Sequence, residues 1–377
     1  MIGRRTLLKG SLGLAAAGAF GLPRFAQAAR DEELNILCWE GYNTDEVLEP
    51  FRDLHAGATV RAESGTSDPD MINKLRAGET KVWDLINVNQ PWAQAQLYPE
   101  GLIKPLDKAR FEPFFETMLP EFQGPYPLAL DSSGKELIGM VQRFGPFSFV
   151  VNTDKISREL AEDQGYKLFL DPAMKDRYGI LTYDNWNVMH MCMAGDIDPF
   201  KPLDEAQMAT FETVAKQIFA GSKLLTDDLV AMNTALINGE IDAYFTGGTY
   251  TASPARFDGQ SQVRGITPKS GPVDGKGGVV WVEVTSLVNN PDPSPLAADF
   301  LEYVQKPEIC KAVAFAEGTY NPVSQMGTKA VLELFDEEEL DAIQWDSLNE
   351  EMERSVDYQI VASYPKLIEI YNAARRG

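Results

Sequence analysis

The sequence predicts an α/β protein whose lobes are doubly wound parallel sheets flanked by helices. Short apolar runs predict strands over 34–38, 58–63 and 83–88. Between them, the chain predicts a helix beginning at Asp45 and a second helix over 68–77. Strands and helices that alternate at this short spacing are typical of a parallel sheet covered by helices.

Aromatic and polar residues follow these strands. The first strand runs directly into Trp39, Glu40 and Tyr42. In open α/β sheets, ligands bind just beyond the carboxyl ends of the strands. Two aromatic rings and a carboxylate at such an end are suited to holding a small cation. The alternative is a strand cap in which Trp39 packs into the core and Glu40 is a solvated turn residue.

Length and composition set the broad class. The chain has 377 residues, of which 44% are hydrophobic and 24% charged, so it is long enough for two globular domains. Its formal net charge of −22 disfavours nucleic acid as a partner. An acidic surface is compatible with a cationic ligand.

The N-terminus predicts an export signal. Arg4 and Arg5 form the paired arginines of a twin-arginine signal, and small apolar residues follow over 12–22. Ala26-Gln27-Ala28 is an A-x-A cleavage site. The apolar run is too short to span a membrane. We therefore expect residues 1–28 to be a signal peptide and the mature protein to be periplasmic, beginning at Ala29.

The middle of the chain carries the first predicted crossing between two lobes. Residues 111–133 are rich in Phe and Pro, which predicts an irregular segment. Strands are expected over 138–141 and 147–152, on either side of the stretch 143–146.

The remaining chain repeats the alternation of strands and helices. The predicted strands are 178–182, 241–246 and the alternating run 278–285, which we take as the return crossing; the predicted helices are an apolar, methionine-rich helix after Asn187, then 206–220, 228–238, 295–304, 307–316, 337–343 and 364–374. The predicted lobes are 29–146 plus 282–318 and 147–281 plus 319–377.

Cysteines and histidines give no sign of catalysis or of a metal site. Cys38, Cys192 and Cys310 match no metal-ligand spacing and are expected to be buried thiols. The histidines are His55, at the end of a predicted surface helix, and His190, in an apolar helix. No nucleophile elbow, P-loop or HExxH motif accompanies them. We therefore expect no enzyme and no cofactor.

Four stretches together resemble the extracellular solute-binding proteins of ABC transporters, in the spermidine/putrescine-binding group. They are the strand ending in Trp39 and Tyr42, Glu63-Ser64 with 83–86 downstream, 239–243, and 318–322. The resemblance implies a two-lobe periplasmic-binding-protein fold of type II, with the ligand clamped between the lobes.

The resemblance also implies a ligand-binding set. Matching positions are aromatic walls at Trp39, Tyr42, Trp92, Trp281 and Tyr320, polar groups at Asn89 and Gln359, and carboxylates at Asp184 and Glu283. Glu40 joins the set as a further carboxylate on chemical grounds, because a protonated amine needs carboxylates at its ends and aromatic faces along its chain.

The sequence departs from the family at two positions. Asn187 stands where a second acid is expected, and Gly247 or a neighbour replaces an expected Trp. Arg143, near the crossing, is suited to a carboxylate or phosphonate if it faces the ligand. These departures leave room for a ligand other than a polyamine.

The expected function is that of a periplasmic substrate-binding protein of an ABC importer, which captures a polyamine such as putrescine or spermidine by lobe closure. Its expected partner is the inner-membrane permease, and the protein is expected to be a monomer. The alternative ligands are a zwitterion, such as an amino acid, opine or aminophosphonate, or ferric ion, for which Tyr244 and Tyr250 are the candidate phenols.

Overall fold

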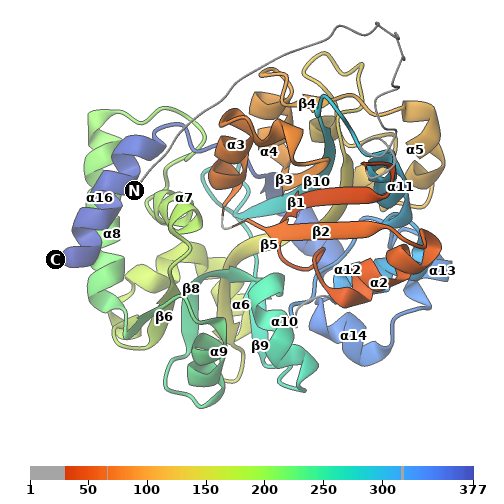
Figure 1. The fold of residues 1–377 in the computed structure, drawn as a ribbon. Helices are drawn as coiled ribbons and strands as arrows, with labels where there is room; N and C mark the ends of the chain where they lie inside the picture. The colour runs from red at the N-terminus through yellow and green to blue at the C-terminus, as the bar shows by residue number, and fades with distance from the viewer. Residues whose placement is uncertain (1–29, 66, 316–317) are drawn as a thin grey trace, which may run out of the picture.

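One mixed sheet forms the centre of the molecule (Figure 1). The computed structural model describes residues 30–65, 67–315 and 318–377, so the predicted signal peptide lies outside the described residues. The main strand order is β2-β1-β3-β10-β5-β8-β6-β7, and β4, β9 and β11 pair with β10 or β5 at the side. The strands are β1 (Glu33–Cys38), β2 (Thr59–Ser64), β3 (Leu85–Asn89), β4 (Ile103–Lys104), β5 (Met140–Asn152), β6 (Tyr178–Leu181), β7 (Leu224–Thr226), β8 (Ala243–Gly248), β9 (Val263–Ile266), β10 (Gly278–Val288) and β11 (Ser355–Asp357).

Helices cover both halves of the sheet. They are α2 (Asp45–Leu54), α3 (Asp68–Arg76), α4 (Gln90–Trp92), α5 (Lys108–Phe115), α6 (Arg158–Gln164), α7 (Asp184–Ala194), α8 (Glu205–Gly221), α9 (Leu229–Ile237), α10 (Thr249–Phe257), α11 (Leu296–Tyr303), α12 (Pro307–Ala314), α13 (Lys329–Leu332), α14 (Glu337–Ala342), α15 (Leu348–Glu353) and α16 (Tyr364–Arg376). Within the described residues, none of them is long and apolar enough to cross a membrane.

The first half of the sheet consists of the parallel strands β2, β1 and β3, with β10 antiparallel to β3. Successive side chains of β1 enter different cores, as expected for a strand buried on both faces. Leu37 packs with Met71 of α3, whereas Ile36 packs in the cluster that holds Phe51 of α2 and Phe300 of α11. The alternation of strands and helices read from the sequence is therefore confirmed.

The second half of the sheet has a similar arrangement of strands. The strands β8, β6 and β7 are parallel, and β5 runs antiparallel to β8. One face packs against α7, α8 and α16, and the other packs against α9 and α10. Figure 1 shows α16, from the end of the chain, lying alongside α8. The methionine-rich α7 is buried as part of this core.

The two halves meet where β5 pairs with β10. The sequence predicted two strands around 143–146, but β5 is continuous through this stretch, which corrects that prediction. Both Gly145 and Pro146 are paired with β10, opposite Trp281 and Val280. The predicted irregular stretch 111–133 is also wrong at its start, because α5 extends to Phe115.

The buried clusters bear on the predicted lobes. Val323, Phe335 and Ile343 pack in the cluster that contains Leu34 of β1. The sequence-based division had placed the stretch 319–377 in the second lobe, so this packing favours moving its first part to the first lobe. Two lobes centred on the two halves of the sheet remain a proposal.

Candidate ligand-binding site

The turn after β1 brings three predicted site residues together. Gly41 has a φ of 107°, a conformation that glycine adopts at little cost, and the chain reverses there. Trp39 and Glu40 stay partly exposed on one side of the turn, while Tyr42 is 2% exposed. The three side chains diverge from here to different partners.

Tyr42 reaches Glu283, which forms a buried ion pair. The Tyr42 hydroxyl donates to Glu283 Oε2 at 2.7 Å. Arg143 donates to the same carboxylate from Nε at 3.0 Å and from Nη2 at 2.8 Å. The side chains of Arg143 and Glu283 are only 3% and 5% exposed. Glu283 therefore accepts three hydrogen bonds from groups of the chain itself, and its charge is balanced by Arg143.

A bulge in the crossing strands creates this pair. On β10, Val282 and Val284 pair with Phe144 and Val141 of β5, so two residues of β5 lie opposite Glu283 alone. On its other side, Glu283 pairs with Asn89 of β3. The register thus places two predicted site residues side by side and adds Arg143 to them.

Asp68, the first residue of α3, forms a second buried acidic centre. Its Oδ1 accepts the Trp39 indole N–H at 3.2 Å and the Asn89 backbone N–H at 3.0 Å. Its Oδ2 accepts the Asn89 side-chain amide at 2.9 Å. Burial raises the pKa of Asp68 to about 6, and the charge of Glu283 adds to the effect of burial. Asp68 thereby holds the side chains of two predicted site residues, Trp39 and Asn89, by hydrogen bonds.

Glu40 connects the two halves of the molecule. Its carboxylate accepts the Tyr250 hydroxyl of α10 at 2.7 Å. Its backbone carbonyl accepts Arg143 Nη2 at 2.6 Å. The Tyr250 ring meets Trp281 edge-on, with ring centroids 6.4 Å apart. This group joins the β1 turn, the crossing strands and the second half.

More aromatic side chains extend the group into the second half. Phe147 of β5 packs edge-on against Trp186, whose ring in turn meets that of Tyr358 at a tilt of 32°, with centroids 4.9 Å apart. Burial, and after it the charge of Asp68, raises the pKa of Tyr358. Burial and the charge of Glu40 raise the pKa of Tyr183 to about 12. The phenols of these tyrosines therefore stay protonated near neutral pH.

Two predicted site residues of the second half are engaged by α16. The Tyr371 hydroxyl donates to Asp184 at 2.8 Å, and Arg375 lies 3.6 Å from the same carboxylate. Asn187 is fully buried and donates to the Leu181 carbonyl at 2.7 Å and to Tyr371 at 3.1 Å. Asn187 thus ties α7 to the end of β6 and to α16.

Three other predicted residues, Gly247, Tyr320 and Gln359, lie apart from the group. Gly247 has no room for a side chain, since an added Cβ would lie 2.5 Å from the ring of Tyr244. Tyr320 packs against Phe257, with centroids 4.6 Å apart. Gln359 is exposed, and it is the neighbouring Tyr358 that is buried. Trp92 is partly buried against the first-half core.

The arrangement adds residues that the sequence did not assign to the amine site: Asp68, Tyr183, Trp186, Tyr358, and Tyr250, which the sequence had named only as a candidate phenol for ferric ion. Asp68 follows the end of β2, so the strand-end rule that drew attention to Trp39 applied to it as well. Tyr250 could be found in the same way, two residues after β8. Tyr358 follows the short strand β11, which the sequence pattern did not reveal.

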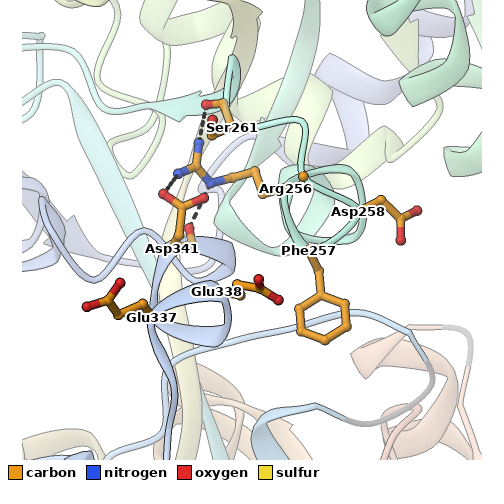
Figure 2. A pocket seen from close by; sticks show the side chains of 8 residues that line it. Arg256, Phe257, Asp258, Ser261, Glu337, Glu338 and Asp341 are labelled. Carbon is orange, nitrogen blue, oxygen red and sulfur yellow. Dashed lines mark hydrogen bonds and ion pairs between the residues drawn. The ribbon is translucent and has the colours of Figure 1, made fainter.

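Figure 2 shows an open pocket at a different place on the molecule. Its volume is about 570 Å³, and none of its lining residues belongs to the predicted site. Arg256 points toward Asp341, to which it donates at 2.6 Å, and Asp258, Glu337 and Glu338 line the same pocket.

Within the described residues, no group of His, Cys, Asp or Glu is arranged to hold a metal ion.

Comparisons with known proteins identify the fold. No family model matches the sequence, and no curated protein matches it either. Among solved structures, the TpPotD lipoprotein of Treponema pallidum superposes with a TM-score of 0.67 at 14% identity, over 92% of this chain and 100% of that one. The spermidine/putrescine ABC transporter substrate-binding protein PotD of Streptococcus pneumoniae gives 0.64 at 16% identity, over 91% and 99%.

Another structural neighbour holds a different ligand. The PBP MotA of A. tumefaciens B6, in complex with glucopine, gives a TM-score of 0.63 at 11% identity, over 91% of this chain and 99% of that one. At such identities the likeness concerns the fold. The chain therefore has the mixed α/β fold of periplasmic substrate-binding proteins, as the resemblance in sequence implied.

Proposed function

We propose that the chain is the substrate-binding component of an ABC importer and that it captures a small ligand carrying a protonated amine. The likeness of almost the whole chain to substrate-binding proteins supports the first part. We include polyamines such as putrescine and spermidine among the candidate ligands because two of the structural neighbours are PotD proteins. The export signal, the periplasmic location, the permease partner and the monomeric state belong to the same proposal.

The charge balance of the site supports an amine. The carboxylate of Glu283 is paired with Arg143, the charge of Glu283 acts on the nearby Asp68, and the backbone carbonyl of Glu40 accepts from the same guanidinium. Three acids and a single base leave the group negative, which favours a cation. The rings of Trp39 and Trp281 lie beside these acids and are suited to the methylene chain and the charged end of an amine. This excess of negative charge between aromatic rings is the observation that carries the proposal.

Ferric ion fits the geometry less well. Tyr244 is fully buried and donates to Asn233, whereas Tyr250 donates to Glu40. Burial raises the pKa of both phenols, which opposes the phenolate form that binds iron. The two tyrosines therefore act as hydrogen-bond donors within the fold.

A thermal-shift screen of the protein beginning at Ala29 tests the proposal. Ligands that bind only the folded state raise Tm by mass action. We expect a rise with amines and none with ferric citrate or with dicarboxylates that lack an amine. Calorimetric titration of Trp281→Ala should show a loss of about tenfold or more in affinity for the amine that binds. Trp345→Ala, a core change away from the group, is the matched control. A screen in which no amine raises Tm would refute the proposal.

A further inference from the structure

The charge of the Glu283 carboxylate is already balanced by Arg143. Oε2 accepts from Tyr42 and from Arg143 Nε, and Oε1 accepts from Arg143 Nη2. Arg143 is always charged in proteins and is held in a bidentate fork, so the pair is electrically neutral. A second ammonium group of a ligand at this place would face a guanidinium in place of a free acid.

Arg143 itself has donors to spare. Its Nη1 is buried and makes no hydrogen bond within the part of the chain that the structure describes. The rest of the guanidinium is fully used: Nε and Nη2 serve Glu283, and Nη2 also donates to the Glu40 carbonyl. A buried charged donor without an acceptor is costly, and such a group in a native fold calls for an explanation.

The surroundings of Arg143 are those of the proposed site. Its guanidinium lies over the Tyr42 ring, 4.8 Å from the centroid. Tyr250 contributes to the raised pKa of Arg143, so its phenol lies near the same guanidinium. Tyr250 also bonds Glu40 and meets Trp281 edge-on. The spare donors thus lie among the residues that carry the amine proposal.

We propose that Arg143 determines specificity by donating from Nη1 to a carboxylate of the ligand. The ligand would then be zwitterionic, with a protonated amine facing Glu40 or Asp68 and a carboxylate on Arg143. This inference rests on the proposed function and narrows its ligand class from amines to amino acids in the broad sense. It also gives a reason for the buried pair of Arg143 and Glu283. A diamine would need the Glu283 carboxylate for its second ammonium group, and Arg143 already binds that carboxylate.

Calorimetric titration with ligands matched in length tests the inference. The pairs are putrescine with 4-aminobutanoate and cadaverine with 5-aminopentanoate, and each pair differs by exchanging an amine for a carboxylate. A charge-assisted hydrogen bond to Arg143 should make the amino acid of at least one pair bind about tenfold or more tightly than its diamine. A longer zwitterion, lysine, and an aminophosphonate extend the panel to other lengths and acids.

Variants of Arg143 show whether this residue sets the preference. Arg143→Gln frees the charge of Glu283, so the ratio of amino-acid to diamine affinity should fall by about tenfold or more and move toward the diamine. Arg143→Lys keeps the positive charge and should continue to disfavour the diamine. Arg256→Gln, at an equally buried arginine paired with Asp341 elsewhere, is the matched control and should leave the ratio unchanged.

The outcomes separate the two proposals. Tighter binding of diamines by the wild-type protein would overturn the role of Arg143 and leave the amine function standing. Tighter binding of amino acids with an unchanged ratio in Arg143→Gln, shown folded by its circular dichroism, would also overturn it. Absence of binding across the panel would overturn both. Because the comparison within each pair is made on the wild-type protein, it holds even where a variant fails to fold.

Discussion

The strand ends of the first half and those of the second carry similar side chains but use them differently. In the first half, Trp39 and Asn89 are both bonded to Asp68, and these side chains lie beside Glu283. In the second half, Asp184 and Asn187 are bonded to Tyr371 of α16. One set forms an acidic, aromatic group between the halves, and the other attaches the last helix to its core.

The two regions differ in the elements that bind the polar groups at the strand ends. The amphipathic α16 covers the α7 and α8 side of the second half. It brings Tyr371 and Arg375 to the start of α7, where Asp184 begins the helix. Over the first half, the corresponding partners come from α3 and from the crossing strands, and Glu40 and Trp39 stay partly exposed.

The largest contrast is expected from removing the acids of the two regions. Glu283→Ala leaves Arg143 buried without its counter-charge, and loss of one partner of a buried pair costs about 3–5 kcal/mol in the free energy of unfolding. Asp184→Ala removes a half-exposed acid and should cost about 1 kcal/mol or less. Chemical denaturation of both variants measures this. Equal losses would show that the two regions do not differ in the way described.

Asp68 should contribute a pH dependence to the stability of the first half. In the folded protein its pKa is about 6, above the ordinary 3.8, so the folded state holds the proton more tightly than the unfolded state does. The wild-type free energy of unfolding should therefore fall, relative to Asp68→Asn, by on the order of 2 kcal/mol between about pH 4 and about pH 7.5.

Denaturation of both proteins across this range provides the measurement. Parallel curves for the wild type and Asp68→Asn would contradict the proposed burial of the Asp68 carboxylate.

A smaller loss of ligand affinity is expected from a substitution at Tyr250, where the two halves are in contact. Tyr250→Phe removes the hydrogen bond to Glu40 and keeps the ring against Trp281. A bond to a partly exposed charged group is worth about 1 kcal/mol, so the affinity should fall by roughly fivefold. Titration with whichever of putrescine and 4-aminobutanoate the wild type binds more tightly checks this. Tyr371→Phe is the matched control on the second half, and an equal loss there would undermine the contrast.

The smallest effect on binding is expected at Asp184 itself. Asp184→Asn keeps the shape of the side chain and an acceptor for Tyr371, so the affinity should change by no more than about threefold. The same titration measures it. A loss of tenfold or more would place Asp184 among the ligand contacts, as the resemblance implied, and would remove the distinction between the two regions.

Local pattern was enough for most of the architecture. The apolar runs before Trp39 and Asn89 form β1 and β3, and Asp204 forms a capping box at the start of α8, the predicted amphipathic helix. These elements depend on residues within a few positions of one another, which the sequence displays directly. The pattern failed at 143–146, because whether this stretch joins a sheet depends on its pairing with β10, more than a hundred residues away.

The site shows the same division between local and distant causes. From the sequence, Trp39, Glu40 and Tyr42 could be placed at the end of a strand, and Arg143 could be noted near a crossing. The sequence did not show which side chain each of these residues binds. Tyr42 and Arg143 contact Glu283 because of the register in which β10 pairs with its neighbouring strands. Asp68 was expected only to begin a helix, and its contact with Asn89 depends on how α3 packs over β3.

The sequence by itself determined the α/β class, the order of the elements and the strand ends at which polar residues gather. Those properties follow from periodicity and from residues that are neighbours in the chain. Only the tertiary structure decided which groups the acids bind: Glu283 is paired with Arg143, and Asp184 is hydrogen-bonded by Tyr371 and lies near Arg375. The physical reason is that the cost of a buried charge depends on the groups around it in space, and the chain brings those groups from far along its length.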